Sequence, residues 1–294
     1  MQAAGIDIGG SKIELRVFGP DWAERARRRL ATPSHYEGLL AVVAELWDWA
    51  AAEGADVVGI CAPGRPDPAS GRHIAANFAA SGKPFAADLG ARLGRPVPVL
   101  HDAAALALSE AHLGAGRGAG SVAALVLGTG VGAGLVTGGN LWHGATGAGG
   151  EIGHLPLPAS AAVDHGLPIL PCGCGRQGCL ETLLAGPGLS RIDAALGGPG
   201  REPAELVGRA PGVWAAWEAL AGHALAVLAA TWDPEMIVLG GGLSSQPEVA
   251  PRLAAALDAV ALPGLARPEI RVADAGDASG ARGAALAAAR AART

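Results

Sequence analysis

Three cysteines and one histidine have the spacing of a metal site. Cys172, Cys174 and Cys179 fall within eight residues and are separated by glycines, and His154 precedes the first of them by 18 residues. Three thiolates and one imidazole complete a tetrahedral zinc site, and four protein ligands are typical of structural zinc. We therefore expect a structural Zn²⁺ that stabilises a glycine- and proline-rich segment. Reduced cysteines without a metal are the alternative interpretation.

A glycine turn with polar neighbours follows the first apolar run of the chain. Gly9 and Gly10 separate Asp7 from Ser11 and Lys12. Glycines let backbone N–H groups approach an anion closely, and the serine and lysine side chains add further donors. The carboxylate would repel a phosphate unless Mg²⁺ lay between them. The segment therefore predicts a Mg²⁺–phosphate site, and an ordinary tight turn is the simpler alternative.

Two further glycine groups occur in the second half of the chain. The run 128–134, Gly-Thr-Gly-Val-Gly-Ala-Gly, resembles a dinucleotide-binding pattern, but an apolar run follows it and the ending of a P-loop is missing. A glycine hairpin with Thr129 can still bind phosphate through its backbone N–H groups. A sharp turn between buried strands explains the same residues equally well. Gly240, Gly241 and Gly242 follow a predicted strand, where the missing side chains would admit a ribose or a flat ring.

A lone aspartate occupies a position at which α/β proteins bind ligands. Asp102 follows an apolar run, 97–100, with only His101 between them, and comes directly before a helical pattern, 103–113. Ligands of open α/β sheets bind at the carboxyl ends of the strands, and a carboxylate there can accept a proton from an attacking hydroxyl group. The alternative is a structural role, because aspartate is also a favoured N-cap residue.

Strands and helices predicted from the apolar periodicity must position these residues. We expect strands at 3–7, 13–18, 57–61, 97–100, 122–127, 134–137 and 236–239. We expect helices at 35–53, 85–93, 103–113, 181–194, 203–209, 213–231 and 281–293. Both halves open on a hairpin with a glycine turn and continue with strands and helices. The pattern predicts an α/β protein with duplicated domains around a cleft.

Composition limits the classes of function. The chain has 294 residues, half of them hydrophobic, which is sufficient for two domains. Its 22 cationic and 27 acidic side chains give a net charge of −5, and it has no dense basic run, so we expect no nucleic-acid partner. The uncharged stretch 118–150 is interrupted by glycines and polar residues, which disfavours a membrane span. The N-terminus lacks the pattern of a signal peptide, and we expect a cytoplasmic protein.

Taken together, these segments resemble the ROK family of sugar kinases over nearly the whole chain. The matching segments are DIGGSK (7–12), APG (62–64), GTGVGAG (128–134), EIGH (151–154), CGCGRQGCLE (172–181), IVLGGGLS (237–244) and GARGAAL (280–286). The segments 75–89 and 106–111 are most similar to the bacterial N-acetylglucosamine kinase branch. The resemblance implies a two-domain actin-like ATPase (ribonuclease H-like) α/β fold. Residues 1–114 with 281–294 would form the smaller domain, and 115–280 the larger domain with the zinc site and the nucleotide-binding turns.

The resemblance also implies a reaction, a set of site residues and a homodimer. The reaction is transfer of a phosphoryl group from ATP, with Mg²⁺, to the 6-hydroxyl group of an amino sugar, N-acetyl-D-glucosamine first, and Asp102 would be the general base. The nucleotide would be bound by Asp7, Gly9, Gly10, Ser11, Lys12, Gly128, Thr129, Gly130, Gly132, Gly240, Gly241 and Gly242. The sugar would be bound by Gly64, Asn77, Ser81, Gly82, His101, Asp102, Glu151, His154 and Glu181. Zinc would be bound by His154, Cys172, Cys174 and Cys179.

Two residues depart from the family pattern around the predicted base. The family usually has Asn-Asp-Ala-Asn, whereas this chain has His101, Asp102, Ala103 and Ala104. A histidine differs from asparagine in shape and protonation, and a protonated His101 would weaken Asp102 as a base. The loop 75–84 is also one residue shorter than in the family. We therefore expect reduced activity on N-acetylglucosamine or a shifted sugar preference.

Three other functions stay open at this stage. The first is a kinase of the same family for glucose, mannose, fructose or N-acetylmannosamine. The second is a sugar-binding pseudokinase, which His101 and Ala104 suggest. The third is a sugar-sensing repressor of the same family, which needs a helix-turn-helix module before the kinase-like core. The first strand is expected at residue 3, so the sequence disfavours the repressor.

Overall fold

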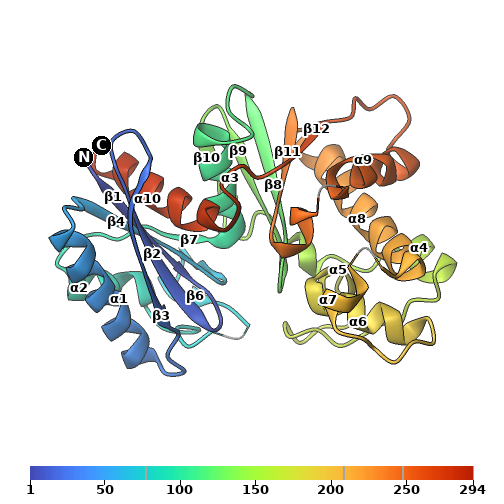
Figure 1. Ribbon diagram of the computed structural model, residues 1–294, viewed down its shortest axis with the longest axis horizontal. Coiled ribbons are helices and arrows are strands. Elements are labelled where there is room, and N and C mark those ends of the chain that lie inside the picture. Colours follow the sequence, from blue (N-terminus) through green and yellow to red (C-terminus); the bar gives the residue numbers. More distant parts are fainter. Residues whose placement is uncertain (77, 208, 247, 294) are drawn as a thin grey trace.

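The computed structural model describes residues 1–76, 78–207, 209–246 and 248–293, and it contains two five-stranded sheets (Figure 1). The first sheet has the order β3 (Glu24–Ala31), β2 (Lys12–Phe18), β1 (Ala3–Ile8), β4 (Val57–Ala62) and β7 (Val99–His101). The second has the order β10 (Asn140–Trp142), β9 (Val131–Thr137), β8 (Ser121–Leu127), β11 (Met236–Gly240) and β12 (Glu269–Val272). Each sheet joins an antiparallel meander of three strands to two strands that run parallel to the first. The two halves therefore repeat one strand arrangement, as the sequence predicted.

Several elements differ from the sequence-based expectations. The strands β3, β10 and β12 and the helix α9 (Val249–Val260) were not expected. The edge strand β3 reads Glu-Arg-Ala-Arg-Arg-Arg-Leu-Ala and is largely exposed, so it lacks the apolar alternation by which strands are detected. The expected strand at 134–137 is longer, since β9 already begins at Val131. The helix expected at 181–194 is interrupted where Gly186 and Pro187 begin a new helix.

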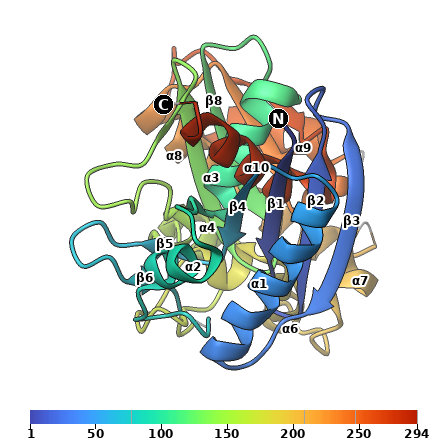
Figure 2. The ribbon, with the colours of Figure 1, turned by 90° about the vertical axis from the view of Figure 1, so that its left-hand side faces the viewer.

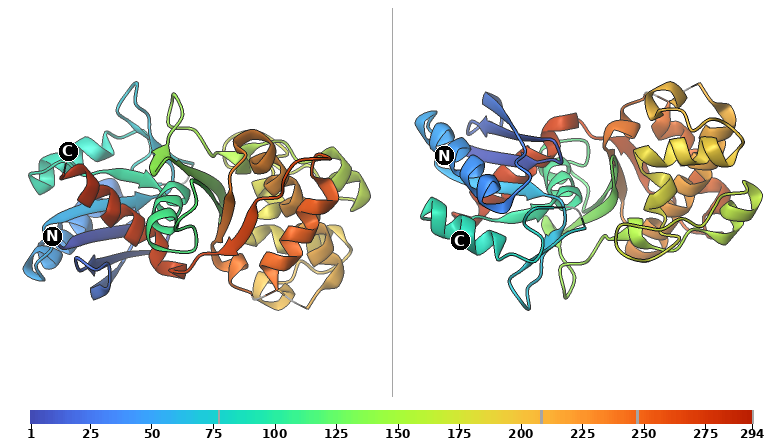
Figure 3. Two further views of the ribbon diagram at one scale, coloured as in Figure 1. Left: turned by 90° about the horizontal axis from the view of Figure 1, so that it is seen from above. Right: turned by 90° about the horizontal axis from the view of Figure 1, so that it is seen from below.

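Two helices lie between the sheets and connect the halves. They are α3 (Asp102–Leu113) and α10 (Ser279–Ala291); in Figure 3, α3 lies in the narrow middle of the molecule, and α10 runs from there along the first sheet. A side chain at Gly5 in β1 would clash with the carbonyl oxygen of Ala281, and one at Gly134 in β9 would clash with that of Ala103. The absent side chains thus let the helix backbones rest directly on the strands.

The remaining helices cover the outer faces of the sheets. In the first half, α1 (Tyr36–Ala52) and α2 (Phe85–Leu93) pack over the sheet (Figure 2), and a small ribbon of β5 (Arg65–Pro66) and β6 (His73–Ile74) lies at its edge. The second half adds α4 (Ala159–Asp164), α5 (Glu181–Leu184), α6 (Gly186–Ala195), α7 (Pro203–Leu206) and α8 (Pro211–Trp232). Short 3₁₀ turns are η1 (Ile152–His154), η2 (Gly242–Ser245) and η3 (Gly276–Ala278).

The helix α8 is long and apolar enough to cross a membrane by length and composition, and it lies in the core of the second half. Within its most apolar 18-residue window, 61% is buried inside the structure. Its central Trp217 is fully buried and donates its indole N–H to the carbonyl oxygen of Leu184 in α5, at 2.9 Å. A buried core helix accounts for its composition.

A buried carboxylate joins the two chain connections between the halves. Glu110 in α3 accepts hydrogen bonds from the backbone N–H of Ala115, after α3, and of Asp274, before α10, both at 3.0 Å. It also accepts from the Ser279 hydroxyl group and the Arg282 guanidinium at 2.9 Å. We predicted one domain from residues 1–114 with 281–294 and a second from 115–280, and this division stays a prediction. Both of its boundaries lie close to the Glu110 network.

Candidate active site

Three parallel strands of the first sheet bring the predicted catalytic and phosphate-binding residues to one edge. The strands β1, β4 and β7 are neighbours, so their carboxyl ends meet. Asp7 is the penultimate residue of β1, Gly64 follows β4, and Asp102 follows β7. The edge therefore holds residues of three separate sequence segments that were each predicted to belong to the site.

Asp102 lies at the start of a helix with its side chain half exposed. The helix α3 begins at Asp102 itself, and His101 occupies the N-cap position, so Asp102 is not the N-cap residue. Its carboxylate accepts a hydrogen bond from the N–H of Ala103 at 2.6 Å, and its side chain is 50% exposed. A carboxylate at a helix N-terminus that also faces solvent is accessible to a substrate hydroxyl group.

His101 is in direct contact with Asp102. The distance between its Nε2 and the carboxylate Oδ1 is 3.0 Å. The ring also lies against β9, because a side chain at Gly132 would come within 2.8 Å of its Cε1 atom. Gly132 thus lies within a strand, and its missing side chain makes room for His101. His101 therefore lies between the predicted base and β9 of the second sheet.

Asp7 is a carboxylate in an unfavourable electrostatic environment. Its pKa is raised to about 6, with burial as the largest cause; a hydrogen bond from the Cys61 thiol opposes the rise, and the negative charge of Asp102 adds to it. Burial also raises the pKa of Cys61, which is fully buried. A divalent cation at this carboxylate would relieve the cost of its charge. A half-buried carboxylate oxygen beside a predicted phosphate-binding turn fits Mg²⁺.

The first glycine turn is held by its own hairpin. The Gly9 N–H donates to the Lys12 carbonyl oxygen at 2.9 Å, and the Thr32 hydroxyl group donates to the Gly9 carbonyl oxygen at 2.7 Å. The Thr32 N–H also donates to the Ser11 carbonyl oxygen at 3.1 Å. Gly10, Ser11 and Lys12 are exposed, so the outer face of this turn is accessible to a ligand.

The second and third glycine turns contact each other. Gly128 donates its N–H to the Gly130 carbonyl oxygen at 3.1 Å, which closes the turn between β8 and β9. Gly241 lies after β11 with a φ of 87°, and a side chain there would come within 2.8 Å of the Gly128 nitrogen. Nothing would obstruct a side chain at Gly242. The structure thus places the predicted phosphate turn and the predicted adenosine turn side by side.

A cavity of about 90 Å³ lies between the two halves. Its lining residues are Arg65, Pro66, Val99, Leu100, His101, Ala104, Gly134, Trp142, His143, Gly147, Gly149 and Glu151. His101 and Glu151 were predicted sugar ligands, whereas Arg65, Trp142 and His143 were not. The glycine-rich run 144–150 could have indicated that this segment lines the cavity, because glycines of the run pack against the Trp142 ring.

The remaining predicted sugar contacts lie around the β5–β6 ribbon. Ser81 donates its hydroxyl group to the Ala75 carbonyl oxygen at 2.7 Å, and Gly82 donates its N–H to the His73 carbonyl oxygen at 2.8 Å. Asn77 lies outside the described residues. Burial lowers the pKa of His73, whose ring contacts the Pro63 carbonyl oxygen at 2.7 Å, so a neutral ring supports the turn that contains Gly64. No role was predicted for His73.

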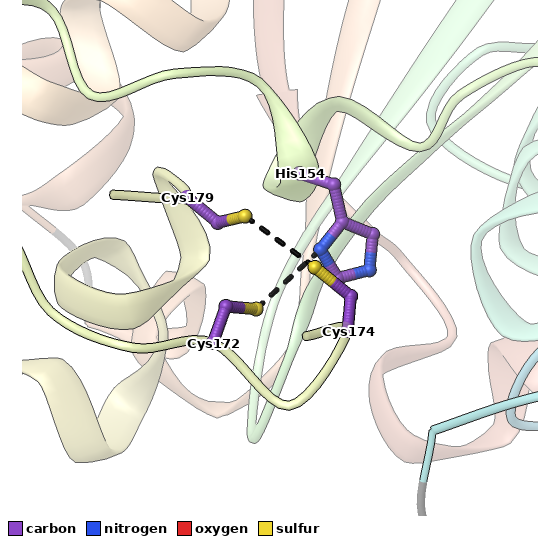
Figure 4. Close-up of side chains that lie close together, drawn as sticks. All are labelled: His154, Cys172, Cys174 and Cys179. Atoms are coloured by element: carbon purple, nitrogen blue, oxygen red, sulfur yellow. Dashed lines mark hydrogen bonds between the residues drawn. The ribbon is translucent and has the colours of Figure 1, made fainter. Parts of the chain in front are cut away.

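The predicted zinc ligands point toward one another (Figure 4). The ligand atoms of His154, Cys172, Cys174 and Cys179 all lie within 4.8 Å of one another. The Cys174 and Cys179 sulfurs are 3.6 Å apart, and the Cys172 sulfur is 3.7 Å from the His154 Nδ1. Tetrahedral Zn–S bonds of about 2.3 Å place thiolates about 3.8 Å apart. The donor set and its spacing therefore fit Zn²⁺.

Two neighbours influence the thiols and the imidazole. A hydrogen bond from the backbone N–H of Arg176 lowers the pKa of Cys174 to about 6, which favours the thiolate form that binds metal. The Arg176 guanidinium donates to the carbonyl oxygen of His154. Burial raises the pKa of Cys179, which a bound cation would counteract.

Two glutamates lie on either side of His154. The Glu151 Oε2 is 3.8 Å from its Nε2, and the Glu181 Oε1 is 4.0 Å from its Nδ1. Three of the predicted sugar ligands are thus adjacent to the cysteine cluster. The other carboxylate oxygen of Glu181 accepts the N–H of Val131 at 3.1 Å, directly after the second glycine turn.

Comparison with known proteins places the chain among sugar kinases. A family model described as ROK family matches residues 3–291. An N-acetylgalactosamine kinase of Shewanella sp. is 38% identical over 94% of this chain and 93% of its own length. An N-acetyl-D-glucosamine kinase of Citrobacter koseri is 39% identical over 94% and 95%.

Two solved structures have the same fold over the whole chain. The ROK hexokinase of Thermus thermophilus has a TM-score of 0.84 and 34% identity, covering 100% of this chain and 99% of that one. A ROK family glucokinase of Streptomyces griseus, in complex with glucose and AMPPNP, has a TM-score of 0.82 and 30% identity, covering 99% and 100%. The similarity confirms the predicted α/β fold class.

Proposed function

The chain belongs to the ROK family, and from this premise we propose that it is an ATP-dependent sugar kinase. It transfers a phosphoryl group to the 6-hydroxyl group of an N-acetylated hexosamine, N-acetyl-D-glucosamine first. The observation that carries the proposal is the position of Asp102, exposed at the strand edge beside Asp7 and next to the cavity between the halves. Curated relatives that are named N-acetylglucosamine and N-acetylgalactosamine kinases support the substrate class.

In the proposed mechanism the protein positions two reactants and stabilises charge, which is most of what phosphoryl transfer requires. The first turn presents exposed backbone groups and Lys12 to the phosphates, and the second and third turns bind the rest of the nucleotide. Mg²⁺, when bound at Asp7, would neutralise phosphate charge. Asp102 aligns the 6-hydroxyl group and accepts its proton. Closure of the two halves would exclude water as a competing acceptor.

The sugar hydroxyl groups are bound by the residues around the cavity. Glu151 and Glu181 accept hydrogen bonds from hydroxyl groups, and His154 lies between the two carboxylates. His101 contacts the sugar from the strand edge, where its bond to Asp102 fixes the ring. The Cys₃His cluster would hold Zn²⁺ with four protein ligands, which would fix His154 and leave no open position for catalysis.

The His101–Asp102 contact also favours a second candidate, a kinase of the same family for another hexose. Because the ring is engaged with the base, it has one nitrogen left for the sugar, whereas an asparagine offers both a donor and an acceptor. We expect this difference to shift the preference among hexoses that differ at one hydroxyl group.

Assembly and location are further parts of the proposal. We propose a homodimer and a cytoplasmic location, with no nucleic-acid or membrane partner. Light scattering after size-exclusion chromatography tests the dimer, because it measures the mass of the particle directly.

A coupled ADP-release assay with Mg-ATP tests the proposed function. The acceptors are N-acetylglucosamine, N-acetylgalactosamine, N-acetylmannosamine, glucose, mannose and fructose, each supplied separately to zinc-replete protein. A dominant N-acetylglucosamine rate supports the first candidate, and dominance of another sugar supports the second. Absence of turnover with all six sugars, in folded protein that binds sugar, would make the chain a pseudokinase.

A further inference from the structure

We propose that Glu181 is a positioning residue for the nucleotide. It couples the Cys₃His cluster to the second glycine turn, which is formed by Gly128, Thr129 and Gly130, and thereby sets the affinity for the phosphates. The inference rests on the proposed function for the identity of the nucleotide. It adds to Glu181 a role that differs from the sugar contact expected from the sequence.

The two oxygens of the Glu181 carboxylate face different parts of the site. The Oε2 atom accepts the Val131 N–H at 3.1 Å, and a side chain at Gly130 would come within 3.0 Å of the same oxygen. The Oε1 atom lies 4.0 Å from the His154 Nδ1 and 3.8 Å from the Cys172 sulfur. One carboxylate thus contacts both the glycine turn and the metal-ligand cluster.

A second contact holds the other side of the same turn. The Gly186 N–H donates to the Gly128 carbonyl oxygen at 2.7 Å. Gly186 comes directly after Ala185, the residue that ends α5, and Glu181 is the first residue of that helix. The glycine turn is therefore contacted by the first residue of α5, Glu181, and by the first residue of α6, Gly186.

The helix α5 is firmly connected to the cysteine cluster and to the core. Cys179 lies two residues before Glu181, and its carbonyl oxygen accepts the buried Thr182 hydroxyl group at 2.8 Å. The Leu184 carbonyl oxygen accepts the indole N–H of the fully buried Trp217. The position of the cluster consequently determines the position of α5, and α5 determines that of the turn.

The glycine turn needs this external support for a physical reason. Its sequence is Gly-Thr-Gly, which has high backbone freedom and no charged side chain of its own. Without external contacts the turn would lose its conformational freedom only when the nucleotide binds. The entropy cost of that ordering would weaken the affinity for the nucleotide. The Val131 N–H donates to Glu181, so it is not available to a phosphate. The backbone N–H groups that can bind phosphate belong to the turn just before Val131, which this hydrogen bond holds in place.

Calorimetric titration of Glu181→Ala with Mg-ADP, without sugar, tests the inference. We expect the Kd for ADP to rise about tenfold, as for loss of one hydrogen bond to a charged acceptor. Metal analysis must show that the variant keeps as much zinc as the wild type, and thermal unfolding must stay cooperative. If Glu181→Ala loses zinc, Glu181→Asp replaces it, because the shorter carboxylate keeps the charge but no longer reaches Val131.

Two further variants separate positioning from sugar binding. Glu181→Gln keeps an oxygen that accepts the Val131 N–H, so we expect an ADP Kd within about twofold of the wild type. Glu151→Ala removes the glutamate on the other side of His154. We expect it to raise the sugar KM while the ADP Kd stays unchanged.

Hydrogen exchange gives a readout that does not depend on catalysis. In Glu181→Ala we expect faster amide exchange in the peptide that covers residues 128–135, without ligand and at full zinc occupancy. Unchanged exchange, or an unchanged ADP Kd with only the sugar KM raised, would overturn the inference. These outcomes leave the proposed function intact. A folded wild type that binds no ADP would instead overturn both the inference and the proposed function, so the two failures are distinguishable.

Discussion

The two halves present a glycine turn to the same site but hold it in different ways. The first turn is closed by Gly9, Lys12 and Thr32, all within or next to its own three-stranded meander, and the half-buried Asp7 lies beside it. The second turn is bound by Glu181, which lies 50 residues further along the chain than its partner Val131. Two sheets with the same strand order have therefore become specialised. The first sheet provides charged groups at its strand ends. In the second sheet, the glycine turn is supported by a long insertion, residues 143–186.

The largest expected effect tests whether the charged chemistry belongs to the first half. Asp102→Asn should lower kcat by about 10²–10⁴-fold, because the amide cannot accept the proton of the attacking hydroxyl group. Sugar and ADP affinities should change little. The coupled assay and calorimetry measure these quantities, and Asp258→Asn, at an exposed position on α9, is the matched control. A loss of less than tenfold would remove Asp102 from the role of general base.

Removal of zinc tests whether the insertion, residues 143–186, stabilises only the second half of the molecule. After chelation we expect the melting temperature to fall by at least about 5 °C, because bound structural zinc contributes folding free energy. Hydrogen exchange should accelerate in residues 143–186 and around Gly130, and should stay slow in β1 and β4. Equal acceleration in both halves would show that the cluster stabilises the whole chain.

The Glu110 network tests how strongly the halves are joined. Glu110→Gln should lower the free energy of unfolding by about 3–5 kcal/mol, because it leaves the buried Arg282 without its carboxylate and places an amide against backbone donors. Urea denaturation measures the change. Glu45→Gln, which breaks an exposed pair with Arg28, should cost less than about 1 kcal/mol. Similar losses for the two variants would contradict a special role of Glu110.

The smallest expected effect is a gain of stability at Asp7. Its pKa is about 6 in the folded protein against a reference value of 3.8, so the folded state binds the proton more tightly than the unfolded state. The wild type should therefore lose up to about 3 kcal/mol of stability as the pH rises from about 4 to about 6. Asp7→Asn should lack this loss and be more stable than the wild type above pH 6 in magnesium-free buffer, while kinase activity falls sharply. Urea titrations at several pH values measure both stabilities. If wild type and Asp7→Asn were equally stable at every pH, the free-energy cost assigned to Asp7 would be disproved.

The sequence predicted some elements well and others poorly, for identifiable reasons. The strands that became β1, β4, β8 and β11 are buried apolar runs, and they appear where they were expected. The edge strand β3 carries arginines in place of an apolar alternation, and β12 alternates Glu-Ile-Arg-Val over only four residues, so neither gave a strong signal. Site residues followed the same rule: glycine turns and clustered cysteines were visible locally, whereas Arg65, Trp142 and His73 acquire a place only through packing.

By itself the sequence determined the ROK family, the α/β fold class and the types of groups available for chemistry, because these depend on residue identity and short spacing. The tertiary structure decided which of these groups meet. It placed His101 against Asp102 and Gly132, and it joined Glu181 to a turn 50 residues away. Such contacts follow from how sheets and helices stack, and a linear pattern records only the composition of each segment.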